Sequence, residues 1–331
     1  MQQREKTSAV PIKVSGTTKE RIRFAATMLD CNQAQIVDVA VEEFVTRHAD
    51  RLEQGIDRAR KVVIGARGEV PYDTLVIATG SAPFIIPVPG KDLPGVVTYR
   101  DLDDTNAMLA MAEKPNARVV VIGGGLLGLE AAAGLRMRGM DVTVLHLMGH
   151  LMDRQLDEAA GYLLRRALED RGIKVICRAS TAQIMGDGHV ECVRLEDETE
   201  LPADLVVMAV GIRPETTLAR AAELAVERGI VVNDQMATSD PDIYALGECV
   251  QHNGQLFGLV APLYDQAKVL AATLAEQAAA FQPKQTATKL KVTGCDLFSA
   301  GDFAEADGRE DIVFRDPARG VYKRLVLEKN K

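Results

Sequence analysis

The segment Val119–Glu130, with the sequence VVVIGGGLLGLE, decides the fold class of this 331-residue chain. A buried-strand pattern leads into Gly123, Gly125 and Gly128, which have the spacing G-x-G-x-x-G, and a helical pattern follows directly. In such a unit the first glycine permits a tight turn, the second lets the backbone approach a pyrophosphate, and the third lets the helix pack closely on the sheet. The helix N-terminus offers free N–H groups to phosphates. The alternative is a glycine-rich turn without a ligand, but the surrounding strands and helix favour a dinucleotide site.

Strand and helix patterns alternate around this segment. We expect strands at 118–122, 141–145 and 173–177, separated by helices at 126–139 and 156–172. This βαβαβ order predicts a parallel sheet with right-handed crossovers. Further strands are expected at 204–210, 230–232 and 243–246, and a further helix at 264–277. The fold class is therefore α/β, with a Rossmann-like dinucleotide-binding domain.

The second strand of this pattern ends in His146. The dinucleotide fingerprint normally has an acid there, which binds the adenosine ribose hydroxyls of NAD. Because no carboxylate follows the strand, the sequence does not separate NAD(H) from NADP(H). His146 either lies near the ribose or caps the strand.

The composition excludes several classes of protein. Aromatic residues make up 4% of the chain and the net charge is −8, which argues against a base-stacking surface and against general polyanion binding. None of the five cysteines forms a C-x-x-C pair, so we expect a reduced cytoplasmic protein without a metal site. The N-terminus has no secretory apolar segment, and the apolar stretch at 119–135 is too rich in glycine to span a membrane.

Two further motifs are LVIATGSAP at 75–83 and TSDPDIYALGE at 238–248. With them, the chain over about residues 60–331 resembles the flavoprotein reductases of the ferredoxin and rubredoxin reductase group. It is most similar to the flavin/nicotinamide portion of the NAD(P)H nitrite reductase large subunit. The resemblance is also carried by the segments VTVLHLMGHLMDRQLDEAAG, GIRPET, IYALGECVQHNGQLFGLVAPLYDQAKVLA and KVTGCDLFSAGDF.

The resemblance implies roles for residues outside the glycine-rich loop. Thr79 and Gly80 would lie at the crossover between the flavin and nicotinamide domains. Glu248, after Gly247 and in place of the usual Asp, would bind the ribityl chain of FAD. The remaining implied positions are a helix opened by Ala261, Pro262 and Leu263 toward the flavin pyrimidine, and Glu130 near the contact of nicotinamide and flavin.

Arg213, in the motif GIRPET, follows a predicted strand. It either touches the nicotinamide nucleotide or is a structural surface arginine. No side chain is assigned a catalytic role, because in this kind of enzyme the flavin carries the chemistry.

The chain also departs from the family. The first glycine-rich loop, which holds the ADP half of FAD in the family, has no counterpart before Gly123. We therefore expect a weak or incomplete FAD site beside a complete NAD(P)H site. Redox-active cysteine pairs, iron–sulfur motifs and a sirohaem domain are not found, so this chain is not expected to reduce nitrite by itself. The tail from Phe281 resembles the start of a C-terminal domain, which we expect to be incomplete and loosely packed.

Residues 1–60 resemble a ribbon-helix-helix module of the antitoxin and small-repressor kind. In that interpretation the strand around Lys13 would enter the DNA major groove, and two chains would pair as a homodimer. The alternative is a capped helical hairpin that only packs on the following segment.

These patterns predict five segments. They are a ribbon-helix-helix-like module at 1–60, a partial flavin-domain segment at 61–115, an NAD(P)-binding domain at 116–236, a flavin-domain return at 237–280, and an incomplete C-terminal domain at 281–331. The first functional hypothesis is an FAD-dependent NAD(P)H oxidoreductase that passes hydride to a flavin and electrons to an acceptor protein or domain. The alternatives are a DNA-binding fusion with a non-catalytic dinucleotide domain, and a fused or truncated product with a damaged flavin site.

Overall fold

A computed structural model of the chain describes residues 55–328, except residues 59–60, 66–67, 293, 305 and 317. The chain divides into two compact units, residues 1–73 and residues 74–331. In the first unit, the described strands β1 (Gly55–Asp57), β2 (Val62–Gly65) and β3 (Gly68–Pro71) form an antiparallel sheet. The ribbon-helix-helix hypothesis concerns residues outside the described ones.

The second unit contains a five-stranded parallel sheet in the order β6-β13-β7-β8-β9. Its strands are β6 (Val96–Thr98), β7 (Arg118–Ile122), β8 (Asp141–His146), β9 (Lys174–Cys177) and β13 (Leu205–Met208), and its helices are α4 (Leu102–Met111), α5 (Leu126–Met137) and α6 (Glu158–Glu169). The predicted βαβαβ order with a parallel sheet is confirmed. Helix α6 begins two residues later than predicted, because the Asp157 side chain caps it by accepting a hydrogen bond from the N–H of Ala160.

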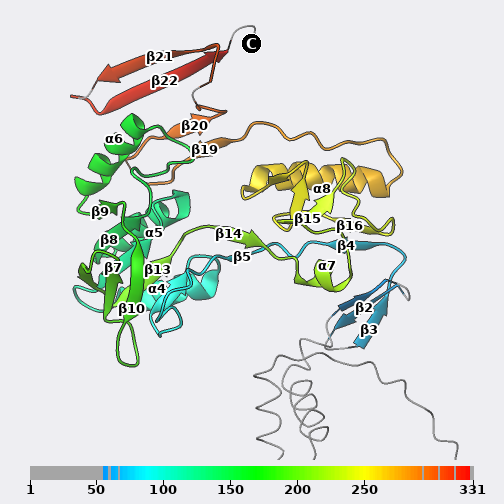
Figure 1. The fold of residues 1–331 in the computed structure, drawn as a ribbon, viewed down its shortest axis with the longest axis horizontal. Helices are drawn as coiled ribbons and strands as arrows, with labels where there is room; N and C mark the ends of the chain where they lie inside the picture. The colour runs from blue at the N-terminus through cyan, green and yellow to red at the C-terminus, as the bar shows by residue number, and fades with distance from the viewer. Residues whose placement is uncertain are drawn as a thin grey trace, which may run out of the picture. The chain divides into compact units, whose positions relative to one another are not determined.

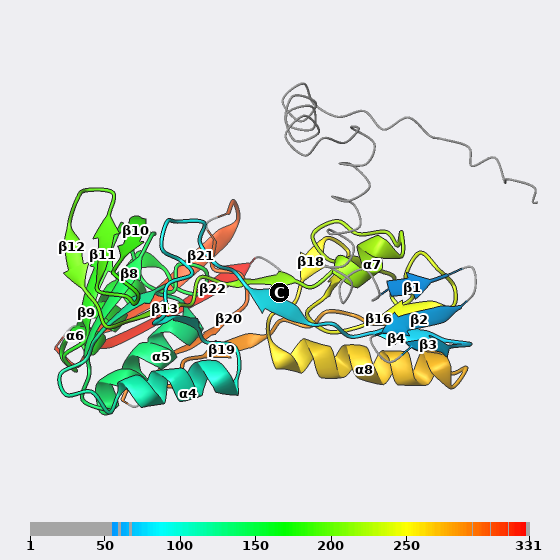
Figure 2. The same cartoon turned by 90° about the horizontal axis from the view of Figure 1, so that it is seen from below.

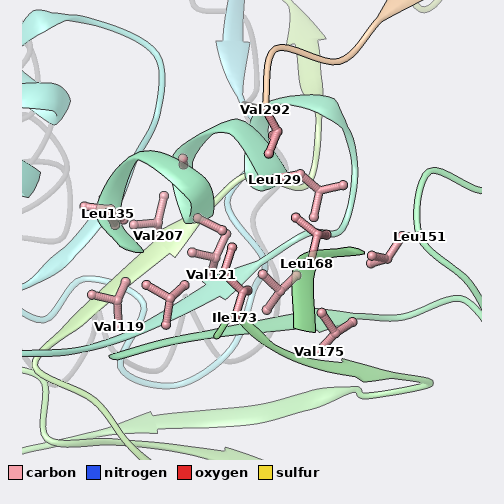
Figure 3. Packing of buried hydrophobic residues seen from close by; sticks show 14 of the residues in the cluster. Val119, Val121, Leu129, Leu135, Leu151, Leu168, Ile173, Val175, Val207 and Val292 are labelled. Carbon is pink, nitrogen blue, oxygen red and sulfur yellow. The ribbon is translucent and has the colours of Figure 1, made fainter. Parts of the chain in front are cut away.

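Apolar side chains of the central strand alternate between two cores. Val119 and Val121 point into a cluster with Leu129 of α5 and Leu168 of α6, as Figure 3 shows. The intervening residue Val120 packs with a second antiparallel sheet on the other face. That sheet consists of β10 (Thr181–Met185), β11 (Cys192–Leu195) and β12 (Glu200–Pro202), and Figure 2 shows it on the side of the parallel sheet opposite α4 and α5. The parallel sheet is thus buried on both faces, which explains its continuous run of valines.

The segments on either side of this domain in the sequence meet in short strand pairs. The elements are β4 (Leu75–Ile77), β5 (Ser81–Pro83), β14 (Ile212–Pro214), α7 (Thr217–Ala221), β15 (Ile230–Val232), β16 (Ile243–Ala245), β17 (Val250–His252), β18 (Gln255–Leu256) and α8 (Val260–Leu274). Strand β4 pairs in parallel with β16, and β5 pairs with β14 in antiparallel orientation (Figure 1). The helix predicted at 264–277 begins four residues earlier, at Val260.

The last part of the chain forms β19 (Ala287–Lys289) paired with β20 (Phe298–Ala300), and a hairpin of β21 (Arg309–Asp316) and β22 (Val321–Glu328). The expectation of loose packing from Phe281 onward is wrong for its first part. Phe281 is buried and meets Phe257 edge-on. Leu290 and Val292 join the helix-side core, where Figure 3 shows Val292 beside Leu129. The apolar surface that these residues bury stabilises their packing on the rest of the unit.

Candidate functional site

The glycine-rich loop connects β7 to α5 at the carboxyl end of the parallel sheet. Gly123 has a φ of 123°, and a side chain there would overlap the backbone carbonyl of Ala209. A side chain at Gly128 would overlap the carbonyl oxygen of Gly123. These two positions therefore require glycine for the turn and for the close approach of α5 to β7, as the fingerprint predicts.

Gly125 differs from its neighbours because its backbone imposes no need for glycine. Its φ is −87°, and a Cβ atom built on it would meet nothing within 4 Å. It is the N-cap of α5, and no side chain caps the free N–H groups of the first turn. An uncapped helix N-terminus facing open space fits the pyrophosphate of a dinucleotide.

His146 ends β8, but its ring turns into the protein. The residue is 8% exposed, and its Nδ1 accepts a hydrogen bond of 3.2 Å from the N–H of Gly124. Its Nε2 lies 3.1 Å from Oδ1 of Asp153. The carbonyl of Gly124 in turn accepts from the N–H of Met152. Of the two roles considered for His146, these contacts favour a structural one, in which the ring braces the phosphate loop.

Glu248 contacts Ser81, the residue that follows Thr79 and Gly80, although it lies 167 positions away in the sequence. The Glu248 carboxylate accepts hydrogen bonds from Ser81 Oγ (2.6 Å) and from Arg100 Nη2 (2.7 Å), and its side chain is 15% exposed. The Thr79 hydroxyl donates a hydrogen bond to the backbone carbonyl of Glu215. No local sequence pattern indicates Ser81 or Arg100 as partners of the Glu248 carboxylate.

Helix α8 is tied to the residue before Glu248 by a hydrogen bond to Gln266. Ala261, Pro262 and Leu263 occupy its first turn, and the N-cap residue Leu259 makes no capping side-chain bond. Gln266, fully buried in the same helix, accepts a hydrogen bond of 2.8 Å from the N–H of Gly247. Gly247 has a φ of 98°, and a Cβ there would meet nothing within 4 Å. An uncapped helix N-terminus fits an electron-rich group such as a flavin pyrimidine.

Glu130 and Arg213 each have protein partners. Glu130 Oε1 accepts a hydrogen bond of 3.0 Å from the N–H of Lys291, which ties α5 to the C-terminal segment. The Arg213 guanidinium stacks over the ring of Phe84, with 4.0 Å between its central carbon and the ring centroid. Each of the two side chains thus has a partner within the protein, and a role at the nucleotide stays a prediction for each.

In the part of the chain that the structure describes, no group of three or more His, Cys, Asp or Glu side chains is placed to hold a metal ion. Among those residues, no helix is both long enough and apolar enough to cross a membrane.

Two family profiles match this chain. The profile of the pyridine nucleotide-disulphide oxidoreductases matches residues 7–278. The chain belongs to this family. A profile of the rubredoxin NAD⁺ reductase C-terminal domain matches residues 287–331. Members of the family bind FAD and NAD(P)H, which confirms the predicted cofactors and fold class. The comparisons give no support for DNA binding through the Lys13 region or for a homodimer through residues 1–60, and the family match begins at residue 7.

Relatives within the family include nitrite reductases. The chain is 50% identical over 278 residues to an NAD(P)H nitrite reductase of Bacillus subtilis, covering 83% of this chain and 34% of that protein. It is 38% identical over 311 residues to the NADH nitrite reductase large subunit of Escherichia coli, covering 90% and 36%. A solved ferredoxin reductase from Rhodopseudomonas palustris superposes with a TM-score of 0.75 at 30% identity, covering 83% and 69%. The chain thus spans about a third of the length of the nitrite reductases that it matches.

Proposed function

We propose that this chain is the NAD(P)H-dependent, FAD-linked electron-transfer portion of an oxidoreductase similar to the nitrite reductase large subunit. The observation that carries the proposal is the open space at Gly125, in front of the uncapped N-terminus of α5. Gly125 is also the N-cap of a helix that directly follows a buried strand, so the free N–H groups of the first turn lie beside this open space, as a pyrophosphate site requires.

The roles proposed for the chain's residues are binding and orientation. Free N–H groups at the start of α5 hold the nucleotide pyrophosphate. Glu248, fixed by Ser81 and Arg100, receives the ribityl hydroxyls of FAD. The N-terminus of α8 stabilises negative charge on the flavin ring. When bound, FAD supplies the acceptor for hydride and releases electrons singly or in pairs.

The proposed partner is an electron-acceptor protein or domain of the ferredoxin or rubredoxin type. Support comes from the match of residues 287–331 to the rubredoxin NAD⁺ reductase C-terminal domain and from the similarity to a ferredoxin reductase. The observation that residues of this segment pack into the core of the parallel-sheet domain supports a fixed place for it.

Anaerobic titration tests the function. The purified 331-residue chain is supplied with excess FAD and then with NADH or NADPH, and the bleaching of the flavin absorbance is followed. We expect nucleotide-dependent bleaching faster than that of free FAD under the same conditions. If neither nucleotide binds the protein by calorimetry, the proposal fails.

A further inference from the structure

The loop after β8 brings a carboxylate to the strand end where the dinucleotide fingerprint lacks one. Asp153 lies seven residues after His146 in the sequence, yet its Oδ1 is 3.1 Å from His146 Nε2. The loop is held in place because the N–H of Met152, the preceding residue, donates to the carbonyl of Gly124 at 2.9 Å. Asp153 therefore occupies the carboxyl end of the sheet, next to the phosphate loop.

His146 itself is poorly placed to be the ribose ligand. Its Nδ1 accepts from the N–H of Gly124, so the ring proton belongs on Nε2, which faces Asp153. The His146 side chain is only 10% exposed. The Asp153 side chain, in contrast, is 27% exposed, and it remains available to a ligand while one oxygen contacts the imidazole.

We propose that Asp153 is the specificity residue of the nucleotide site, and that it selects NAD(H) over NADP(H). The inference rests on the proposed function, because it assumes that the pyrophosphate lies at α5. A nucleotide anchored there extends its adenosine ribose toward the end of the second strand. A carboxylate accepts hydrogen bonds from the ribose hydroxyls of NAD(H), and it repels the additional phosphate of NADP(H).

His146 acts as a positioning residue in this arrangement. Its Nε2 lies 3.1 Å from the Asp153 carboxylate and limits where that carboxylate can lie, while Nδ1 fixes the loop that holds the pyrophosphate. A buried imidazole thus links the phosphate subsite to the ribose subsite. The acid that the fingerprint expects at residue 146 is supplied from the next loop.

A basic side chain close to the loop after β8 would instead favour NADP(H). Arg178 follows β9, and its guanidinium nitrogens would lie 3.6 Å from a Cβ atom built on Gly149. An arginine beside the ribose is the usual device for binding the 2′-phosphate of NADP. If Arg178 played that part, the protein would prefer NADP(H).

The test compares dissociation constants for NADH and NADPH by calorimetry in four proteins. They are the parent chain, Asp153→Asn, Arg178→Gln, and the matched control Asp187→Asn, which changes an exposed aspartate in the turn between β10 and β11. We expect the parent to bind NADH at least about tenfold more tightly than NADPH, and Asp153→Asn to lose most of that ratio, since one charge-assisted contact corresponds to about tenfold in affinity. Asp187→Asn and Arg178→Gln should keep the ratio.

The ratio of the two dissociation constants shows whether Asp153 selects the nucleotide or only supports the loop. Asparagine still offers an oxygen to His146, so Asp153→Asn should keep the thermal midpoint of the parent. Equal weakening of both nucleotides in this variant would show that Asp153 only braces the loop, and would overturn the proposal. A parent that binds both nucleotides equally, or prefers NADPH in a way that Arg178→Gln abolishes, would also overturn it, whether or not the asparagine variant folds. Binding of neither nucleotide would instead refute the proposed function beneath it.

Discussion

The glycines of the phosphate loop differ in what a side chain would meet at each residue. At Gly123 and Gly128 it would overlap backbone carbonyl groups, whereas at Gly125 it would project into open space. A substitution at Gly125 therefore separates ligand binding from folding, which a substitution at the other two positions cannot do.

We expect Gly125→Val to lower the affinity for NADH and NADPH by at least about tenfold, because the side chain would fill the space of the pyrophosphate and remove charge-assisted contacts. The thermal midpoint should change little. Gly134→Val is the matched control, since Gly134 is exposed on the same helix and also has no atom within 4 Å. Calorimetric titration measures the affinities. Equal affinities for the Gly125 variant and the parent would contradict a pyrophosphate site at this loop.

Asp204 shows how one buried carboxylate joins two strands. It accepts hydrogen bonds from the Arg118 guanidinium at 3.0 Å, from the N–H of Arg118 at 2.8 Å, and from Lys114 Nζ at 2.9 Å. The side-chain hydrogen bonds from Arg118 are the main reason that the pKa of Asp204 lies well below its usual range. The stability that it contributes is therefore complete above the unfolded carboxyl pKa and is lost as the pH falls below it.

Asp204→Asn should lower the free energy of unfolding at neutral pH by about 1–3 kcal/mol, because Arg118 and Lys114 lose the charged acceptor of their hydrogen bonds. The difference from the parent should shrink as the pH falls below about 4, where the unfolded carboxyl becomes protonated. Urea unfolding at several pH values measures it. A difference that stays constant down to low pH would show that the ionised carboxylate is not what joins the strands.

At the level of elements, periodic patterns predicted the strands and helices that are continuous in sequence. The parallel strands are buried on both faces and read as unbroken apolar runs, so β7, β8 and β9 were found within one or two residues. The antiparallel strands β10–β12 were not predicted, and neither was β21. Short or exposed strands carry little periodicity, because their pairing partners and not their own sequences stabilise them.

In the candidate site, too, features that are local in sequence were predictable and long-range contacts were not. The glycine-rich loop was predictable because its three glycines lie within six residues, between a strand pattern and a helix pattern. The contact of His146 with Asp153 and that of Glu248 with Ser81 and Arg100 join residues 7, 167 and 148 positions apart, and no local pattern encodes them. The roles assigned to Glu248 and to the start of α8 came from family resemblance, and the structure adds the partners that orient them.

The packing of α5 on β7 can be tested through Gly128. Gly128→Ala places a methyl group against the Gly123 carbonyl, so the helix must shift away from the strand. We expect the free energy of unfolding to fall by about 1–3 kcal/mol, as for other overpacked sites, and nucleotide affinity to fall with it. Gly134→Ala, the same change at an open position of this helix, should instead stabilise the protein by up to about 1 kcal/mol. Chemical denaturation of both variants gives the comparison, and unchanged stability of Gly128→Ala would contradict the close contact.

For the whole molecule, the question is how two cofactors share one chain. The 331 residues cover about a third of the length of the nitrite reductases that they match. A test of the whole chain therefore concerns electron transfer from NAD(P)H to a flavin. The proposed NAD(P)H site is built within one strand–loop–helix unit. The proposed flavin contacts at Thr79, Glu248 and α8 come from segments on both sides of that unit, and they would bind only the ribityl and ring half of FAD.

We expect the 331-residue chain to bind FAD weakly and to purify colourless, with NAD(P)H-dependent dye reduction only when FAD is added in excess. By family resemblance, a first glycine-rich loop holds the ADP half of FAD, and this chain has no G-x-G-x-x-G before Gly123. Each charge-assisted hydrogen bond contributes about 1.5–3 kcal/mol, so the lack of two or three such bonds weakens a nanomolar site to about micromolar or worse. The absorption spectrum and a fluorescence titration with FAD measure this affinity. A yellow preparation with stoichiometric FAD would contradict the prediction, because it would mean that another part of the chain supplies the contacts to the ADP half.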